Sequence, residues 1–127
     1  MSGFWVFMLA ADLLIPIVMV AFGLVFMRRP PKNINRTYGY RTRRSMINED
    51  TWAFAHRFCG RLWLICGSVL FAATIVVFAV IIGAPVEMVG MIGLIVCMAQ
   101  VVPLAFSIIP TEIALRMNFD REGNRKG

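Results

Sequence analysis

Three long apolar runs dominate the pattern of hydrophobic and polar positions along the chain. They cover residues 4–27, 62–82 and 86–109. An α-helix rises about 1.5 Å per residue, so about 20 apolar residues cross a hydrocarbon layer of about 30 Å. The pattern therefore predicts three transmembrane helices, with spans of about 4–27, 60–83 and 86–110.

The segment before the second run carries the signals of a helix start. Asn48 is a favourable N-cap, and Glu49 and Asp50 fall in the first turn, where the helix dipole favours negative charge. A helix from this cap to residue 82 would be about 50 Å long, which exceeds the hydrocarbon thickness. Its first turns should therefore form an interfacial helix at the membrane surface.

Turn and composition signals complete the predicted domain. Pro30 and Pro31 cannot continue the first helix and open a loop over residues 28–59, whereas residues 83–85 make a sharp turn between the second and third spans. Residues 1–117 then form a single three-helix domain. Residues 118–127 are polar and basic, which predicts a flexible tail.

The distribution of charged residues predicts how the helices are oriented in the membrane. The chain has 127 residues, of which 59% are hydrophobic and only 16% charged, which leaves room for one membrane domain. The chain has thirteen Lys and Arg and seven Asp and Glu. The Lys and Arg lie in the 28–61 segment and towards the C-terminus. By the positive-inside rule both are cytoplasmic and the N-terminus is outside. Basic residues at the ends of apolar runs favour anionic lipid headgroups and no nucleic acid.

Asp12 is the ionisable residue within the first apolar run, about 12 Å from its start. Pro16 removes the hydrogen bond to the carbonyl four residues earlier, so the backbone oxygen of Asp12 is freed beside its carboxylate. These oxygens suit a proton, a small cation or a donor from another helix. The other interpretation is a neutral Asp12 that joins helices by hydrogen bonding.

The third span places small and polar residues on one helical face, which should face the bundle. Gln100 is deep enough to reach Asp12, and Glu112 should emerge at the cytoplasmic surface to pair with a loop arginine. The face consists of Gly90, Gly93, Cys97, Gln100, Ser107 and Thr111.

The loop concentrates turn chemistry and charge. Gly39 stands between Tyr38 and Tyr40, and next comes Arg41, whose guanidinium suits phosphate or carboxylate groups. Two interpretations stand beside each other: interfacial anchoring of Tyr and Arg among headgroups, or a pocket for a specific anionic ligand. Further along, Trp52 and His56 share a helical face. His56 is either an interfacial hydrogen-bonding residue or a pH switch.

The chain offers no recognisable catalytic or metal-binding set. Its single histidine excludes a multi-histidine site, and its three cysteines lack C-x-x-C spacing, which favours a packing role. Paired carboxylates and a nucleophile with its base are also missing from the pattern. We therefore expect no catalytic residue, no metal and no cofactor.

The stretch NRTYGYRT, from Asn35 through Gly39 to Thr42, resembles the N-x-x-x-G-[IFY]-R-[TS] hallmark of the SdpI/YfhL family of small bacterial membrane proteins. In that family a tryptophan-bearing helix follows, here represented by Asn48, Trp52 and Gly60. The resemblance implies a cytoplasmic-membrane protein related to immunity factors that protect a cell against a secreted, membrane-active peptide toxin. The family's immunity protein also sequesters a transcriptional repressor and has an additional N-terminal membrane region.

These observations support three hypotheses of different classes. The first is a non-enzymatic binding protein that engages a peptide toxin, a lipid headgroup or a membrane protein. The second is an accessory subunit of a larger membrane complex, and a weaker third is transport or lipid handling centred on Asp12. The glycine faces also suit a homo-oligomer.

Overall fold

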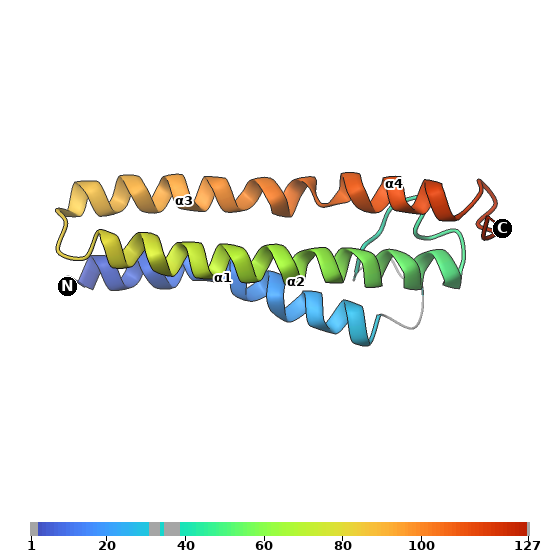
Figure 1. Cartoon of the computed structure of the whole chain (residues 1–127), viewed down its shortest axis with the longest axis horizontal. Coiled ribbons are helices and arrows are strands. Elements are labelled where there is room, and N and C mark those ends of the chain that lie inside the picture. The colour runs from blue at the N-terminus through green and yellow to red at the C-terminus, as the bar shows by residue number, and fades with distance from the viewer. Residues whose placement is uncertain (1–2, 31–33, 35–38, 127) are drawn as a thin grey trace.

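The computed structural model describes residues 3–30, 34 and 39–126. In these ranges the chain forms α1 (Gly3–Arg28), α2 (Glu49–Val80), α3 (Val86–Phe106) and α4 (Ile108–Asn118). The helices make an elongated bundle, with the two ends of the chain at opposite ends of its long axis (Figure 1). We call the end that holds residues 39–48 and α4 the loop end.

Three helical segments of the described residues are long and apolar enough to cross a membrane: Gly3–Arg28, Glu49–Val80 and Val86–Asn118. The last contains α3 and α4, which follow one another along a similar direction and are separated at Ser107 (Figure 1). The prediction of an all-α protein with three spans is thus confirmed. The third helical segment extends to Asn118, past the predicted limit of residue 110.

The start of α2 follows from its capping chemistry. The Asn48 side chain accepts a hydrogen bond from the Thr51 N–H at 2.9 Å, and the Thr51 hydroxyl accepts one from the Asn48 N–H at 3.1 Å. This reciprocal capping box satisfies two backbone donors that the helix itself leaves open. The helix begins at the cap that the sequence predicts, and it runs without a break from Glu49 to Val80, so the predicted interfacial helix and the second span are one continuous helix.

Small residues bring α1 and α2 into close contact. A Cβ atom added at Gly60 would lie 2.7 Å from the Gly23 carbonyl oxygen, and one added at Gly23 would lie 2.7 Å from the Gly60 carbonyl oxygen. A Cβ atom added at Gly67 would lie 2.9 Å from the Met19 Cβ and 3.1 Å from the Pro16 carbonyl oxygen. Glycine on both helices permits this approach in a membrane, where van der Waals packing drives association.

The helices pack together at the end away from the loop, whereas α1 and α4 lie apart at the loop end. Far from the loop end, Trp5 packs on Phe78 and donates a hydrogen bond to its carbonyl oxygen at 3.0 Å, in a cluster with Ile81 and Val89. Within the described residues α1 contacts α2 and α3, and α4 contacts α2 but not α1. α1 accordingly diverges from α4 towards the loop end (Figure 1).

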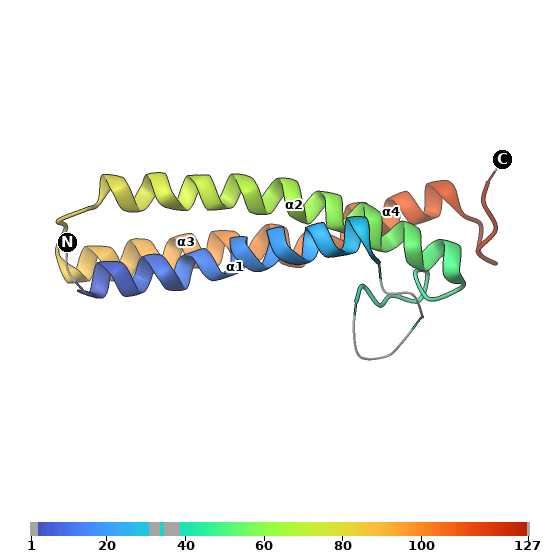
Figure 2. The ribbon, with the colours of Figure 1, turned by 90° about the horizontal axis from the view of Figure 1, so that it is seen from below.

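The residues after α4 fold back on the loop end, where a flexible tail was expected. Phe119 is buried with Ala55 and Leu115, and it forms an isolated β-bridge with Arg125. The Asn48 amide donates a hydrogen bond to the Gly123 carbonyl oxygen at 2.8 Å. The composition of the tail did not indicate this arrangement, because it depends on one aromatic side chain and one long-range hydrogen bond. In Figure 2 the tail lies beyond α4, at the same end of the bundle as the connecting loop.

Candidate functional site

His56 attaches the connecting loop to α2. The Tyr40 N–H donates a hydrogen bond to His56 Nε2 at 2.8 Å, and His56 Nδ1 lies 2.8 Å from the Trp52 carbonyl oxygen. A neutral imidazole that carries its proton on Nδ1 satisfies both contacts, since one nitrogen then donates and the other accepts. The ring is fully buried and stacks at a tilt on Trp52, with 4.3 Å between ring centroids. These two contacts favour the hydrogen-bonding interpretation of His56, and the pH switch stays a prediction.

Position 39 requires glycine for two reasons. Its φ is +106°, in a region that L-residues rarely adopt. The space that a Cβ would need is occupied by His56 Nε2. The backbone of the loop therefore lies directly on the imidazole.

Tyr40 attaches the same loop to α4. Its hydroxyl donates a hydrogen bond to Glu112 Oε1 at 2.9 Å. Burial, together with this hydrogen bond to the Glu112 carboxylate, raises the pKa of Tyr40, so the phenol stays neutral. Glu112 was expected to hold the loop against the third span through an arginine. It does hold the loop, and the partner in this contact is the tyrosine.

A compact turn joins the loop to the start of α2. The Thr42 N–H donates to Ser45 Oγ at 2.8 Å, and the Ser45 N–H donates to Thr42 Oγ1 at 3.2 Å. The Thr51 hydroxyl lies 3.1 Å from the Ser45 carbonyl oxygen. Sequence reasoning missed Ser45, although a hydroxyl three residues after Thr42 is a local turn signal.

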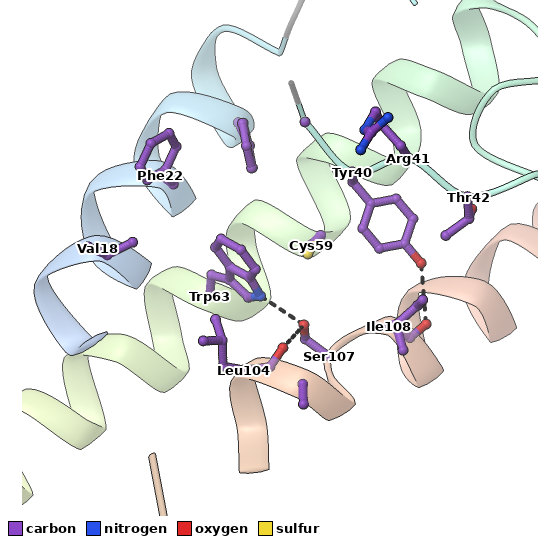
Figure 3. A pocket seen from close by; sticks show the side chains of 13 residues that line it. Val18, Phe22, Tyr40, Arg41, Thr42, Cys59, Trp63, Leu104, Ser107 and Ile108 are labelled. Carbon is purple, nitrogen blue, oxygen red and sulfur yellow. Dashed lines mark hydrogen bonds between the residues drawn. The ribbon is translucent and has the colours of Figure 1, made fainter. Parts of the chain in front are cut away.

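The loop roofs a pocket of about 490 Å³ between α1, α2 and the α3–α4 junction. Figure 3 shows Tyr40, Arg41 and Thr42 on the loop side, with Trp63 and Leu104 on the helices opposite. The lining residues are Val18, Phe22, Phe26, Gly39, Tyr40, Arg41, Thr42, Cys59, Trp63, Leu104, Ala105, Ser107 and Ile108. The pocket thus combines apolar helix walls with one polar, cationic side.

Ser107 closes the pocket wall at the break between α3 and α4. The Trp63 indole N–H donates to Ser107 Oγ at 2.8 Å, and Ser107 Oγ lies 2.8 Å from the Leu104 carbonyl oxygen (Figure 3). Ser107 was predicted to be an intramembrane polar residue alongside Asp12 and Gln100. The structure places it at the pocket, apart from those two.

Asp12 and Gln100 meet in the middle of the bundle. Gln100 Nε2 donates hydrogen bonds to the Asp12 carbonyl oxygen and to Thr74 Oγ1, both at 2.8 Å. The first acceptor is the oxygen that Pro16 frees, so α1, α2 and α3 are joined at one point. Both side chains are buried, and among the described residues Asp12 Oδ2 and Gln100 Oε1 have no hydrogen-bond partner.

The candidate residues of the loop thus fall in one place. Gly39 to Thr42 line the pocket, while Trp52 and His56 lie beneath the loop and support it. Asn35 and Tyr38 lie outside the described residues. A binding role for any of these residues remains a prediction.

These features define a helical membrane protein with three spans and a pocket roofed by its connecting loop. The model of the SdpI/YfhL protein family matches residues 32–111, and the chain belongs to this family. It is similar to the uncharacterized protein YfhL of Bacillus subtilis (strain 168), with 42% identity over 53 residues. The match covers 42% of this chain and 48% of the relative, about half of its length. No solved structure matches the chain.

Proposed function

We propose that the chain is a non-enzymatic immunity or envelope-protection protein that binds a membrane-active peptide or a membrane partner at the loop end. The observation that carries this proposal is the position of the motif segment Gly39–Thr42, which roofs the pocket and is fixed by His56 and Glu112. A loop held rigidly over a cavity presents its side chains in a preorganised geometry, which favours binding.

The residues of this site have different roles in the proposal. Arg41 lines the pocket and supplies a guanidinium for a carboxylate or phosphate group. Trp52 does not line the pocket but is buried against His56, which accepts the Tyr40 N–H. Arg41 is therefore proposed to contact the partner, and Trp52 to position the loop.

The proposed location is the bacterial cytoplasmic membrane, with the N-terminus outside and the C-terminus in the cytoplasm. The basic loop and tail support this orientation through the positive-inside rule. The pocket then opens near the cytoplasmic surface, where it can receive a partner that has entered the bilayer.

Survival of a sensitive bacterium that expresses the chain tests this function. Expression should raise survival against a cognate membrane-active peptide by at least tenfold, and Arg41→Ala should abolish the gain while the protein level holds. Trp52→Ala should lower protection through loss of loop position. Arg116→Ala, at an exposed arginine of α4 that does not line the pocket, serves as the matched control. Unchanged survival across a panel of candidate peptides would exclude an immunity function.

A second candidate function is that of an accessory subunit. α2 and α3 leave between them a shallow apolar depression of about 140 Å³, where Ala73 and Ala99 offer little side-chain bulk. Small residues at such a surface allow close approach of another helix. Purification in a gentle detergent would then yield a stoichiometric membrane partner, whereas a partner-free particle contradicts this role.

A further inference from the structure

The pocket at the loop end is bordered by exposed apolar side chains of α1 and α4. Within the described residues no Cα atom of α1 lies within 8 Å of one of α4, and side chains at the edge of the pocket remain accessible. Phe22 is 39% exposed and Ile108 is 43% exposed, and both line the pocket. The mouth is therefore apolar and lies between two membrane helices.

The surroundings limit what can fill this space. A cavity of about 490 Å³ is far larger than the voids of a packed interior, so a molecule bound there gains dispersion contacts with its walls. An apolar mouth that faces hydrocarbon gives access to acyl chains, and water gains little from the apolar helix walls. The filling that the bilayer itself supplies is a lipid tail.

The polar side of the pocket adds a headgroup preference. Arg41 and Thr42 stand on the loop side, where a guanidinium and a hydroxyl can bind phosphate oxygens. Arg43 and Arg44 follow Thr42 directly in the chain, and together with Arg121 they line a second hollow of about 430 Å³. Such clusters attract anionic lipids over zwitterionic ones.

We propose that this pocket binds one anionic phospholipid, with an acyl chain between α1 and α4 and the phosphate beside Arg41 and Thr42. The lipid fills the space under the loop and completes the contact between the loop and α1. This inference goes beyond the proposed function and does not depend on it. If a peptide also binds in this pocket, it has to displace the lipid.

Two loss-of-binding variants address the two halves of the site. Ala105→Trp fills the pocket from α3 without a change of charge, and Arg41→Gln removes the charge without a change of walls. Their controls are Ala72→Trp, at an exposed position of α2 outside the pocket lining, and Arg116→Gln. Circular dichroism and size exclusion establish that each variant folds.

The chain of residues 1–127 is reconstituted in nanodiscs of phosphatidylglycerol and phosphatidylcholine, transferred to gentle detergent, and analysed by native mass spectrometry. We expect about one retained phosphatidylglycerol per chain, with at least tenfold less in Ala105→Trp and Arg41→Gln and no change in the controls. Equal retention of phosphatidylcholine would overturn the anionic preference. Full retention by folded Ala105→Trp would overturn the site.

The survival assay on the same variants separates this inference from the immunity proposal. If a variant loses the lipid but the cells still survive, the lipid site stands. The pocket then has no part in the proposed immunity function. Retention of lipid by Ala105→Trp refutes the lipid site whatever the survival. A peptide bound in place of lipid after purification from cells would also count against a resident lipid.

Discussion

At the scale of single residues, Gly39 combines a backbone requirement with a packing requirement. Its φ of +106° favours glycine, and its α-carbon faces the His56 ring. Gly83 shares only the first property, with a φ of +82° and open space where a Cβ would lie. Comparing substitutions at Gly39 and Gly83 therefore distinguishes the effect of backbone strain from that of a steric clash.

We expect Gly39→Ala to destabilise the loop end much more than Gly83→Ala destabilises its turn. Gly83→Ala should lower the free energy of unfolding by about 1 kcal/mol, the cost of a left-handed conformation for a residue with a Cβ. Gly39→Ala should cost at least about 2 kcal/mol, because it also displaces His56 from the Tyr40 N–H. Thermal unfolding in detergent measures both, and equal losses would contradict the contact with His56.

Residue patterns predicted local features better than the partners of individual side chains. The cap at Asn48 and the carbonyl freed by Pro16 follow from neighbours within four residues, and the structure contains both. The Tyr40–Glu112 hydrogen bond joins residues that are 72 positions apart. Charge alone favoured an arginine as the partner of Glu112, and nothing local in the sequence distinguishes the two.

At the scale of elements, Gln100 is the polar junction of the three spans. It donates to the carbonyl oxygen of Asp12 on α1 and to the hydroxyl of Thr74 on α2. The sequence placed Gln100 on an inward face and within reach of Asp12. It did not pair Gln100 with Thr74, because helical periodicity gives the face of each helix but not their relative rotation or register.

A double-mutant cycle of Gln100→Leu and Thr74→Val should therefore show coupling. Interhelical hydrogen bonds in membranes contribute about 0.6 kcal/mol, and we expect a coupling energy of that size. The cycle of Thr74→Val with Thr111→Val is the control, since Thr111 lies on α4 and its hydroxyl contacts the Ser107 carbonyl oxygen. Unfolding free energies measured for both cycles test the junction, and additivity in the first cycle would contradict it.

At the scale of the whole molecule, an odd number of spans places the two ends of the chain at opposite ends of the bundle (Figure 1). The turn before α3 and the N-terminus share one end, whereas the basic loop, α4 and the tail share the other. Because the basic loop and the tail lie at the same end, the positive-inside rule predicts that this end is cytoplasmic. It also decides from which side of the membrane the loop end can be reached.

Cysteine labelling of intact cells should establish this orientation. Glu87→Cys, in the exposed first turn of α3, should react with a membrane-impermeant maleimide in intact cells. Glu122→Cys, in the exposed part of the tail, should react at least tenfold more strongly after lysis than before it. The parent chain sets the background, since Cys59 is buried and Cys66 and Cys97 lie within apolar helices. Labelling of Glu122→Cys but not of Glu87→Cys in intact cells would show the opposite topology, with the loop end outside. That result would contradict the orientation expected from the positive-inside rule.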